Sequence, residues 1–315
     1  MKKILFLSIG IILFAFTTIS PTKKITFNYY ISKVTFNKNF LIAGLENGDI
    51  YIKNFKTLKT ISKITLPKIH DFMGNIIPMP IYSLDISKDN KLLILAEDEN
   101  AKRTLFIYNL NNKKLQKIFT SNQTFMKAKF INNENIILAK LSDEITLFNL
   151  KSKKFIYNSQ IDSYVFSNFC LNNKKDKIAI GDESGNIKIA NTLTGKKIKT
   201  IIGFNKDKTL SLDYQKNEII NASSDKRIGI YNENGNTLLT LEAKFLPYAA
   251  SLSPNLNTFA IQYDEKNNIM VYSKYKKPLF LLHGHKMPLN GMKYLNNDEI
   301  LSFSPSEILI WKIKE

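Results

Sequence analysis

Ile228-Gly229-Ile230-Tyr231 is one of seven copies of a four-residue pattern that runs through the chain. Two apolar residues flank a variable one, and the fourth position is aromatic in most copies. The other six copies are Ile50-Tyr51-Ile52-Lys53, Leu105-Phe106-Ile107-Tyr108, Ile145-Thr146-Leu147-Phe148, Ile187-Lys188-Ile189-Ala190, Ile269-Met270-Val271-Tyr272 and Ile308-Leu309-Ile310-Trp311. Their fourth residues lie 55, 40, 42, 41, 41 and 39 positions apart. A period of about 40–45 residues with several strands in each unit indicates the blades of a β-propeller.

The fourth unit shows the content expected of one blade. Short turns rich in Gly, Asn and Asp separate its strands, as in β-hairpins. The four strands are predicted at Tyr164–Leu171, Lys177–Gly181, Asn186–Asn191 and Lys196–Ile202. No segment after the first twenty residues has a sustained helical period. The sequence therefore predicts an all-β, seven-bladed β-propeller that occupies residues 21–315 as one domain.

Both ends of the chain are expected to share the last blade. The seventh unit ends at Glu315, directly after the Trp311 strand, and therefore lacks a fourth strand. Lys23–Tyr30 precedes the first unit and has no partner within it. An unpaired sheet edge favours aggregation, and pairing of these two segments would remove it. We therefore expect the ring to be closed by an N-terminal strand.

The first twenty residues are typical of an export signal. Lys2 and Lys3 precede the apolar segment Ile4–Phe16, and small or polar residues follow as far as Ser20. We expect a signal peptide at residues 1–20. Because Ala15-Phe16-Thr17 resembles a cleavage site only loosely, an uncleaved N-terminal anchor is the alternative, although the apolar segment is short for a membrane span. In both cases the propeller would lie in the periplasm, tethered to the inner membrane in the second.

The net charge of +18 comes almost entirely from lysine, since arginine occurs only at Arg103 and Arg227. The lysines are scattered along turns and strand edges, and specific contacts to phosphates and bases rely mainly on arginine. We expect no nucleic-acid partner. The single cysteine, Cys170, excludes an intrachain disulfide and a cysteine-based zinc site. Its apolar neighbours in Phe166–Leu171 predict a small buried hydrophobic residue.

No set of residues in the sequence indicates catalysis. The chain has three histidines, of which His283 and His285 are two positions apart and could share a metal only if carboxylates joined them. Several acids lie near predicted strand ends or turns, where capping and solubility explain them. They are Asp85, Asp98, Asp182 and Asp213. We therefore expect no enzyme, no metal and no cofactor; a propeller enzyme of unknown substrate is an alternative.

The longest interval between units, Leu66–Pro80, contains three prolines and one glycine, which predict a loop. The segment is unusually apolar for a loop, and adaptable apolar surfaces rich in methionine suit protein contacts. The candidate partner-binding residues are His70, Phe72, Met73, Ile76, Ile77 and Met79. In the alternative interpretation, this loop folds over one mouth of the central channel and buries its own apolar side chains.

The unit resembles a degenerate WD40 repeat, and the last copy carries the resemblance best. In the WD40 family a His, a Ser or Thr, an Asp and a Trp form a hydrogen-bonded chain inside a blade. By position the matching residues are Gly284, His285, Ser302 or Ser304, and Trp311. The Asp is missing, because the turn reads Ser306-Glu307. Unit five keeps Asp225 in the turn and has Tyr231 in the place of the Trp.

A narrower resemblance concerns the whole chain. An exported propeller of this size, rich in Lys and Asn and without cysteine chemistry, is similar to the NapL family of accessory proteins encoded with periplasmic nitrate reductases. The resemblance implies a monomeric, non-catalytic protein-interaction module that serves as an accessory or assembly factor and has nitrate reductase subunits as partners. A scaffold for outer-membrane protein assembly is the alternative, although that family is usually anchored through an N-terminal Cys that this chain lacks.

Overall fold

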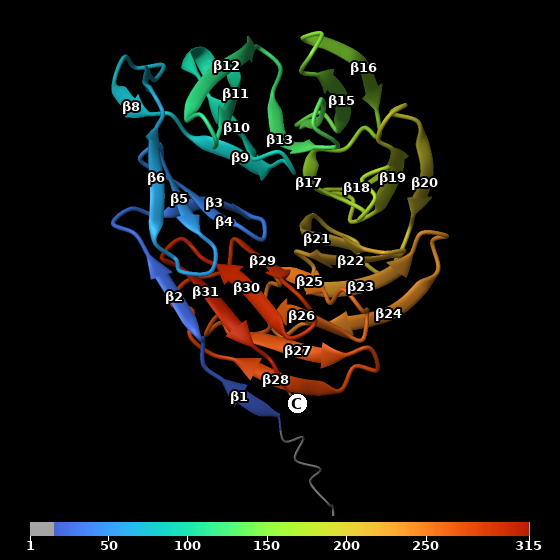
Figure 1. Cartoon of the computed structure of the whole chain (residues 1–315). Helices are drawn as coiled ribbons and strands as arrows, with labels where there is room; N and C mark the ends of the chain where they lie inside the picture. Colours follow the sequence, from blue (N-terminus) through green and yellow to red (C-terminus); the bar gives the residue numbers. More distant parts are fainter. Residues whose placement is uncertain (1–15, 315) are drawn as a thin grey trace, which may run out of the picture.

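The computed structural model describes residues 16–314, so the predicted signal in residues 1–15 lies outside the described part. Seven antiparallel sheets are arranged around a common centre (Figure 1), which confirms the predicted all-β, seven-bladed propeller. The element that is not a strand is a single 3₁₀ turn, η1 (Glu99–Ala101). Between residues 16 and 314 there is no helix with the length and apolar character needed to cross a membrane.

The first four blades follow one another along the chain, each with its strands in the order inner to outer. Blade one has β3 (Ile31–Phe36), β4 (Phe40–Leu45), β5 (Asp49–Asn54) and β6 (Thr60–Thr65). Blade two has β9 (Ile81–Ile86), β10 (Lys91–Glu97), β11 (Arg103–Asn109) and β12 (Lys114–Ser121). Blade three has β13 (Phe125–Phe130), β14 (Asn135–Lys140), β15 (Glu144–Asn149) and β16 (Lys154–Gln160). Blade four has β17 (Phe166–Leu171), β18 (Lys177–Asp182), β19 (Ile187–Asn191) and β20 (Lys197–Ile201), within two residues of the predicted bounds.

The last three blades complete the ring. Blade five has β21 (Thr209–Gln215), β22 (Glu218–Ser223), β23 (Arg227–Asn232) and β24 (Thr237–Glu242). Blade six has β25 (Ala250–Leu252), β26 (Thr258–Gln262), β27 (Ile269–Ser273) and β28 (Pro278–Leu282). Blade seven has β29 (Gly291–Tyr294), β30 (Glu299–Phe303) and β31 (Glu307–Lys312). The repeated pattern of the sequence is the third strand of every blade, which is buried because a blade packs on each of its faces.

The two ends of the chain meet in blade seven. β2 (Lys23–Thr26) pairs antiparallel with β31, with Ile25 opposite Ile308, and forms the outermost strand of that blade. β1 (Thr17–Ile19) adds in parallel to β28 as a fifth strand of blade six. Thr17–Ile19 falls within the predicted leader of residues 1–20, so this part of the segment is paired with the propeller.

The hydrophobic core consists of seven clusters, and each cluster joins two adjacent blades. Blades one and seven share one of them, in which Leu41 and Ala43 pack with Ile308 and Ile310. Packing is therefore continuous around the described ring, and no interface between neighbouring blades is left without an apolar contact.

The inner strands of blades one, three, four and five share an irregularity near their first residue. The pairing register shifts between Ile31 and Lys33 in β3, and the same shift recurs at the corresponding place in β13, β17 and β21. A bulge of this kind re-aims the side chains that follow it. It gives equivalent residues of different blades the same relation to the centre of the ring.

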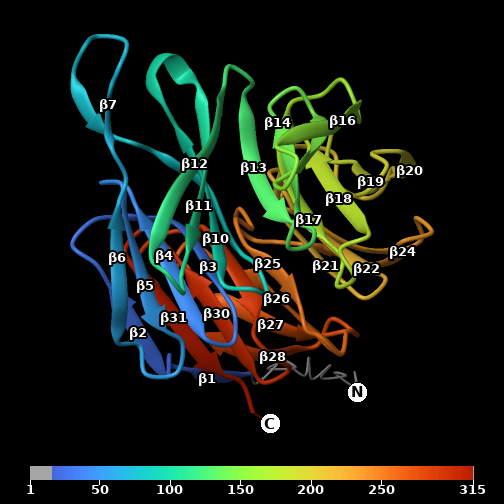
Figure 2. The ribbon, with the colours of Figure 1, turned by 45° about the horizontal axis from the view of Figure 1, so that its top comes forward.

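The predicted loop at Leu66–Pro80 is wrong in one respect, because the segment is a hairpin. β7 (Lys68–His70) and β8 (Ile76–Pro78) pair antiparallel, with Ile69 opposite Ile77. The hairpin stands at the outer edge of the ring beside blade two, away from the centre (Figures 1 and 2). Its position supports a projecting surface and not a cap over the channel.

Candidate functional site

The hairpin formed by β7 and β8 has a buried base and an exposed tip. Ile69 and Met79 are buried in the cluster between blades one and two, and Ile77 packs against that cluster. The side chains at the tip are instead exposed: Phe72 is 94% exposed, Met73 74% and Ile76 65%. The six candidate residues are therefore divided: Met79 serves the core, and Phe72, Met73 and Ile76 form the apolar surface that we call the hairpin tip.

A hydrogen-bonded turn fixes the hairpin tip. The backbone N–H groups of Met73 and Asn75 each donate to Asp71 Oδ1 over 2.8 Å, and Asn75 Nδ2 donates to Asp71 Oδ2 over 3.0 Å. Gly74 has a φ of 85°, which a residue with a side chain rarely adopts. The hydrogen bonds from Asn75 hold the pKa of Asp71 below its usual value. The apolar tip is therefore presented by an ordered turn.

The side of the hairpin is tied to blade two. The His70 backbone N–H donates to Glu99 Oε1 over 3.2 Å, and His70 Nδ1 lies 2.8 Å from the same oxygen. Glu99 belongs to η1, which connects β10 and β11. The hydrogen bond with the His70 ring is the main cause that lowers the pKa of Glu99. His70 thus orients the hairpin, while its side chain remains exposed.

The WD40-like residues of blade seven form a hydrogen-bonded chain. Trp311 Nε1 donates to Ser302 Oγ over 2.8 Å, and Ser302 Oγ lies 2.7 Å from His285 Nε2. Ser302 Oγ thus connects the Trp311 indole to the His285 ring. Gly284 lies against Trp311, since an added Cβ would come within 3.3 Å of the indole. Ser304 is hydrogen-bonded to Ser306 and does not take part in this series of hydrogen bonds.

Glu307 stands where the WD40 family places its Asp. Its Oε1 is 3.5 Å from His285 Nδ1, and it accepts a 2.8 Å hydrogen bond from the Lys286 backbone N–H. Lys24 of β2 reaches Glu307 Oε2 over 2.9 Å. Burial lowers the pKa of His285 to about 4, so the ring is neutral at pH 7. The Asp is absent, as the sequence indicates, and Glu307 lies in its place near a His285 Nδ1 that has no hydrogen-bond partner among residues 16–314. Through Lys24, Glu307 links this site to the N-terminal strand.

Blade five contains a second network of the same plan with different residues. Tyr231 Oη donates to Asn205 Oδ1 over 2.8 Å, and Asn205 Nδ2 donates to Ser223 Oγ over 2.6 Å. Ser223 Oγ in turn donates to Asp225 Oδ1 over 2.5 Å. Asn205 replaces the His and Tyr231 replaces the Trp. Sequence reasoning identified Asp225 and Tyr231 but missed Asn205 and Ser223, because Asn and Ser in turns are too common to stand out.

A buried charged cluster joins blades three and four. The Lys188 ammonium forms an ion pair with Asp182, and both side chains are fully buried. Asp162 Oδ2 lies 3.2 Å from the same Lys188 nitrogen. Asp143, in the turn between β14 and β15, is buried with no hydrogen bond to either carboxylate oxygen. Asp182 caps a turn, as predicted, since its Oδ1 accepts from the Ser184 backbone N–H over 2.9 Å, and it also belongs to a buried ion pair.

Asp143 provides a test of this cluster by pH. Burial, and then the charge of Asp182, raises its pKa from 3.8 to about 7. The folded state thus binds the Asp143 proton more tightly than the unfolded state, and stability falls as pH rises from about 4 to 7. We expect Asp143→Asn to raise the free energy of unfolding by about 1–3 kcal/mol at pH 8, because it removes an ionised carboxylate that lacks hydrogen bonds.

The measurement is urea denaturation of both proteins at pH 8 and pH 5. At pH 5 the folded carboxyl is already neutral but the unfolded one is still ionised, so the difference between the two proteins is expected to be smaller than at pH 8 without vanishing. Asn accepts the left-handed backbone of this position, where φ is 58°, so the substitution adds no strain. A variant that is less stable than the parent at pH 8 would contradict the assignment.

Two predicted turn acids, Asp85 and Asp213, lie instead on inner strands of the ring. Asp85 Oδ2 accepts from the Phe130 backbone N–H over 2.8 Å, and Asp213 Oδ2 accepts from that of Leu252 over 3.0 Å. Each acid therefore links its blade to the inner strand of the next. Both also form ion pairs, Asp85 with Lys129 over 3.0 Å and Asp213 with Lys293. The interpretation of these two acids as capping groups is therefore wrong.

The remaining sequence candidates do not form a metal or catalytic site. His283 is exposed and its Nδ1 contacts Asn268 Oδ1 over 2.9 Å, whereas His285 is buried, so the two rings do not converge. Cys170 is half-buried on β17 and not fully buried as predicted. Within residues 16–314 no group of three or more His, Cys, Asp or Glu side chains is placed to hold a metal ion.

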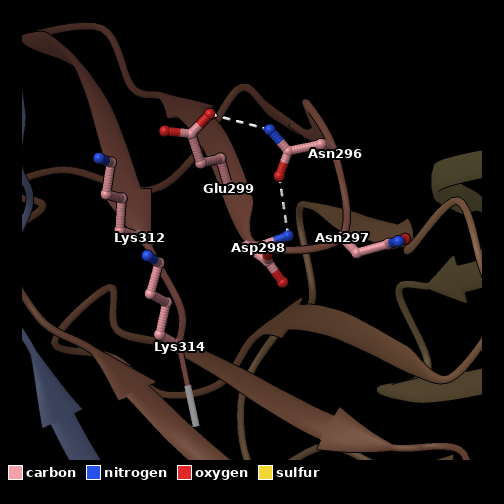
Figure 3. A pocket seen from close by; sticks show the side chains of 6 residues that line it. All are labelled: Asn296, Asn297, Asp298, Glu299, Lys312 and Lys314. Carbon is pink, nitrogen blue, oxygen red and sulfur yellow. Dashed lines mark hydrogen bonds between the residues drawn. The ribbon is translucent and has the colours of Figure 1, made fainter.

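A shallow polar pocket of about 260 Å³ lies on the rim of blade seven (Figure 3). It is lined by Asn296, Asn297, Asp298, Glu299, Lys312 and Lys314. Asn296 uses its amide within the turn, donating to Glu299 Oε2 over 2.9 Å and accepting from the Asp298 backbone N–H over 2.8 Å. The pocket has no apolar wall, and most of its side chains are exposed. These features do not favour it as a ligand site.

Comparison with known proteins supports the fold alone. No protein-family profile and no curated protein matches the chain. Among solved structures, the chain is similar to the β-propeller domain of Cps50 (Swd1) from Myceliophteria thermophila, with a TM-score of 0.74 and 14% identity. The match covers 93% of this chain and 100% of that domain. The chain is thus a seven-bladed β-propeller with WD40-like repeats.

Proposed function

We propose that this protein is a non-catalytic protein-interaction module of the periplasm that binds its partner through the hairpin tip. The carrying observation is the exposure of Phe72, Met73 and Ile76 on an ordered turn. Large apolar side chains exposed to water favour association, since a partner that covers them removes their apolar surface from water. The rest of the chain supports the same role, because a propeller is a rigid disc that presents surface.

The partner that we propose is a subunit of a periplasmic nitrate reductase, with the protein acting as an accessory or assembly factor. The resemblance of the chain to the NapL family motivates this choice, together with the export signal expected in its first twenty residues. The apolar tip suits a factor that binds an incompletely folded client, because the exposed Met73 side chain can adapt to irregular apolar surfaces.

The tip is tested by replacing Phe72 and Met73 together with serine. We expect the double variant to lose at least thirtyfold in partner affinity, as is typical when central apolar anchors are removed. Its stability should change by less than about 0.5 kcal/mol, because both side chains are exposed. Tyr275→Ser is the matched control, since Tyr275 is 79% exposed on blade six, remote from the hairpin.

The measurement is capture from periplasmic extract of cells respiring nitrate, with mass spectrometry of the bound proteins. Recovery of nitrate reductase subunits by the parent and by Tyr275→Ser, but not by the tip variant, is the expected result. Equal capture by all three proteins would assign the partner surface elsewhere. Recovery of outer-membrane assembly proteins, or of no protein, would contradict the nitrate reductase proposal.

A further inference from the structure

The centre of the propeller carries charge that the hairpin does not use. The first residue of the repeated pattern lies on the third strand of a blade and pairs with a residue of the second strand. That residue pairs in turn with one residue of the inner strand. In blades one to five these inner-strand residues lie at equivalent positions. These residues, which we call the first ring, are Lys33, Ser83, Lys127, Asn168 and Ser211. Two positions further along the strands are Thr35, Asp85, Lys129, Cys170 and Asp213, which we call the second ring. Side chains two apart on a strand point to the same side.

The second ring is electrically balanced. Lys129 pairs with Asp85, and Asp213 pairs with Lys293, which reaches it from the equivalent position of blade seven. Asp213 also accepts a 2.7 Å hydrogen bond from Ser251 Oγ. Every ammonium of this ring therefore has a carboxylate in contact.

The first ring has two ammonium groups and no carboxylate. Lys127 Nζ donates to Asn168 Oδ1 and to the Phe169 carbonyl, both over 2.7 Å, and these oxygens are neutral. Lys33 makes no hydrogen bond or ion pair with any residue from 16 to 314. The hydroxyl between them, Ser83 Oγ, is committed to the Ala128 backbone. Two positive charges thus remain without a counter-charge.

The surroundings make these charges costly. Burial, and then the charge of Lys129, lowers the pKa of Lys127 to about 7; the charge of Lys33 acts in the same direction, while Cys170 and Asp85 oppose the shift. Burial also lowers the pKa of Lys33, although its side chain is accessible to solvent. An ammonium that is partly removed from water and has no counter-charge favours the binding of an anion, which supplies that charge.

We propose that the first ring is a binding site for a small oxyanion, held between Lys33 and Lys127 at the centre of the ring of blades. The two ammonium groups supply the charge. The Asn168 side chain is fixed next to Lys127, because its Oδ1 accepts from Lys127 Nζ and from the Phe169 backbone N–H. Phosphate, sulfate and carboxylate groups have the multiple acceptor oxygens that this arrangement suits.

The test is calorimetric titration of the purified exported protein with sulfate at constant ionic strength. Sulfate is the probe because its charge does not change between pH 6 and 8. We expect saturable binding at pH 6 that weakens at least tenfold in Lys33→Met and in Lys127→Met. Lys154→Met is the matched control, since Lys154 is exposed on the outer strand of the same blade as Lys127, and its affinity should stay within twofold.

Affinity should also fall as pH rises through 7, by about tenfold between pH 6 and pH 8, because Lys127 loses its proton over that range. The hairpin variant Phe72→Ser/Met73→Ser should bind sulfate like the parent, so this site and the partner surface fail or succeed separately. Absence of saturable binding, or equal weakening by Lys154→Met, would overturn the proposal.

Discussion

Lys188→Met is expected to lower the free energy of unfolding by about 3–5 kcal/mol at pH 7, the cost of removing one partner of a buried ion pair. The physical reason is that Lys188 is surrounded by carboxylates. Its ammonium contacts the fully buried carboxylate of Asp182 and that of Asp162, and Asp143 lies close enough for its pKa to depend on Lys188. Without the lysine, the acids at the interface of blades three and four lose the cation that contacts them.

Urea denaturation at pH 7 measures this loss. Lys196→Met is the control, because Lys196 is exposed in a turn of the same blade and should contribute less than about 0.5 kcal/mol. Adding Asp182→Asn to Lys188→Met should restore part of the stability, since a neutral pair leaves no buried charge. If Lys188→Met lost less than about 1 kcal/mol, the carboxylates would have to be solvated or protonated already.

Trp311→Ala is expected to cost about 3–5 kcal/mol, as is usual for the truncation of a buried aromatic residue. Trp311 is fully buried in the cluster between blades six and seven, and its indole N–H holds the Ser302 hydroxyl that orients His285. The substitution removes both the packing and the hydrogen bond. Thermal and urea denaturation of the purified variant would measure the loss.

Two milder substitutions divide this effect into its parts. Trp311→Phe keeps most of the packing and removes the donor, so about 1–2 kcal/mol should be lost. Ser302→Ala leaves the Trp311 N–H and His285 Nε2 without a partner, and a loss of about 1–3 kcal/mol is expected. If Trp311→Phe were as unstable as Trp311→Ala, the hydrogen-bonded chain would outweigh the packing, contrary to the energetics proposed here.

The architecture was predictable because its signal is repeated. A strand buried on both faces is apolar along its length, and seven such strands at one spacing leave few alternatives to a propeller. The hairpin at Leu66–Pro80 was missed because Pro78 and Pro80 indicate a loop, whereas the pairing of Ile69 with Ile77 depends on a turn organised by Asp71. Proline occurs in loops but can also end a strand, as Pro78 does in β8.

The charged centre of the ring could not be predicted from single strands. Lys127 and Lys129 alternate with apolar residues in β13, and the same alternation describes a strand with one face in open water. Only closure of the ring brings these lysines together with Lys33 at its centre. An alignment of the first strands of all repeats would place Lys33 and Lys127 at equivalent positions. Comparison between blades, and not any single strand, therefore carries the signal for this charged centre.

The pairing of β2 with β31 has a consequence for how the protein folds. Thr22 and Ile310, which are hydrogen-bonded beside this pair, are 288 positions apart in sequence, so the ring can close only after the C-terminal residues have been synthesised. Contacts of such long separation slow folding, and an open ring exposes blade edges in the meantime. Once the ring is closed, neither end can separate without breaking the pairing between β2 and β31. The same pairing should therefore make the protein slow to fold and slow to unfold.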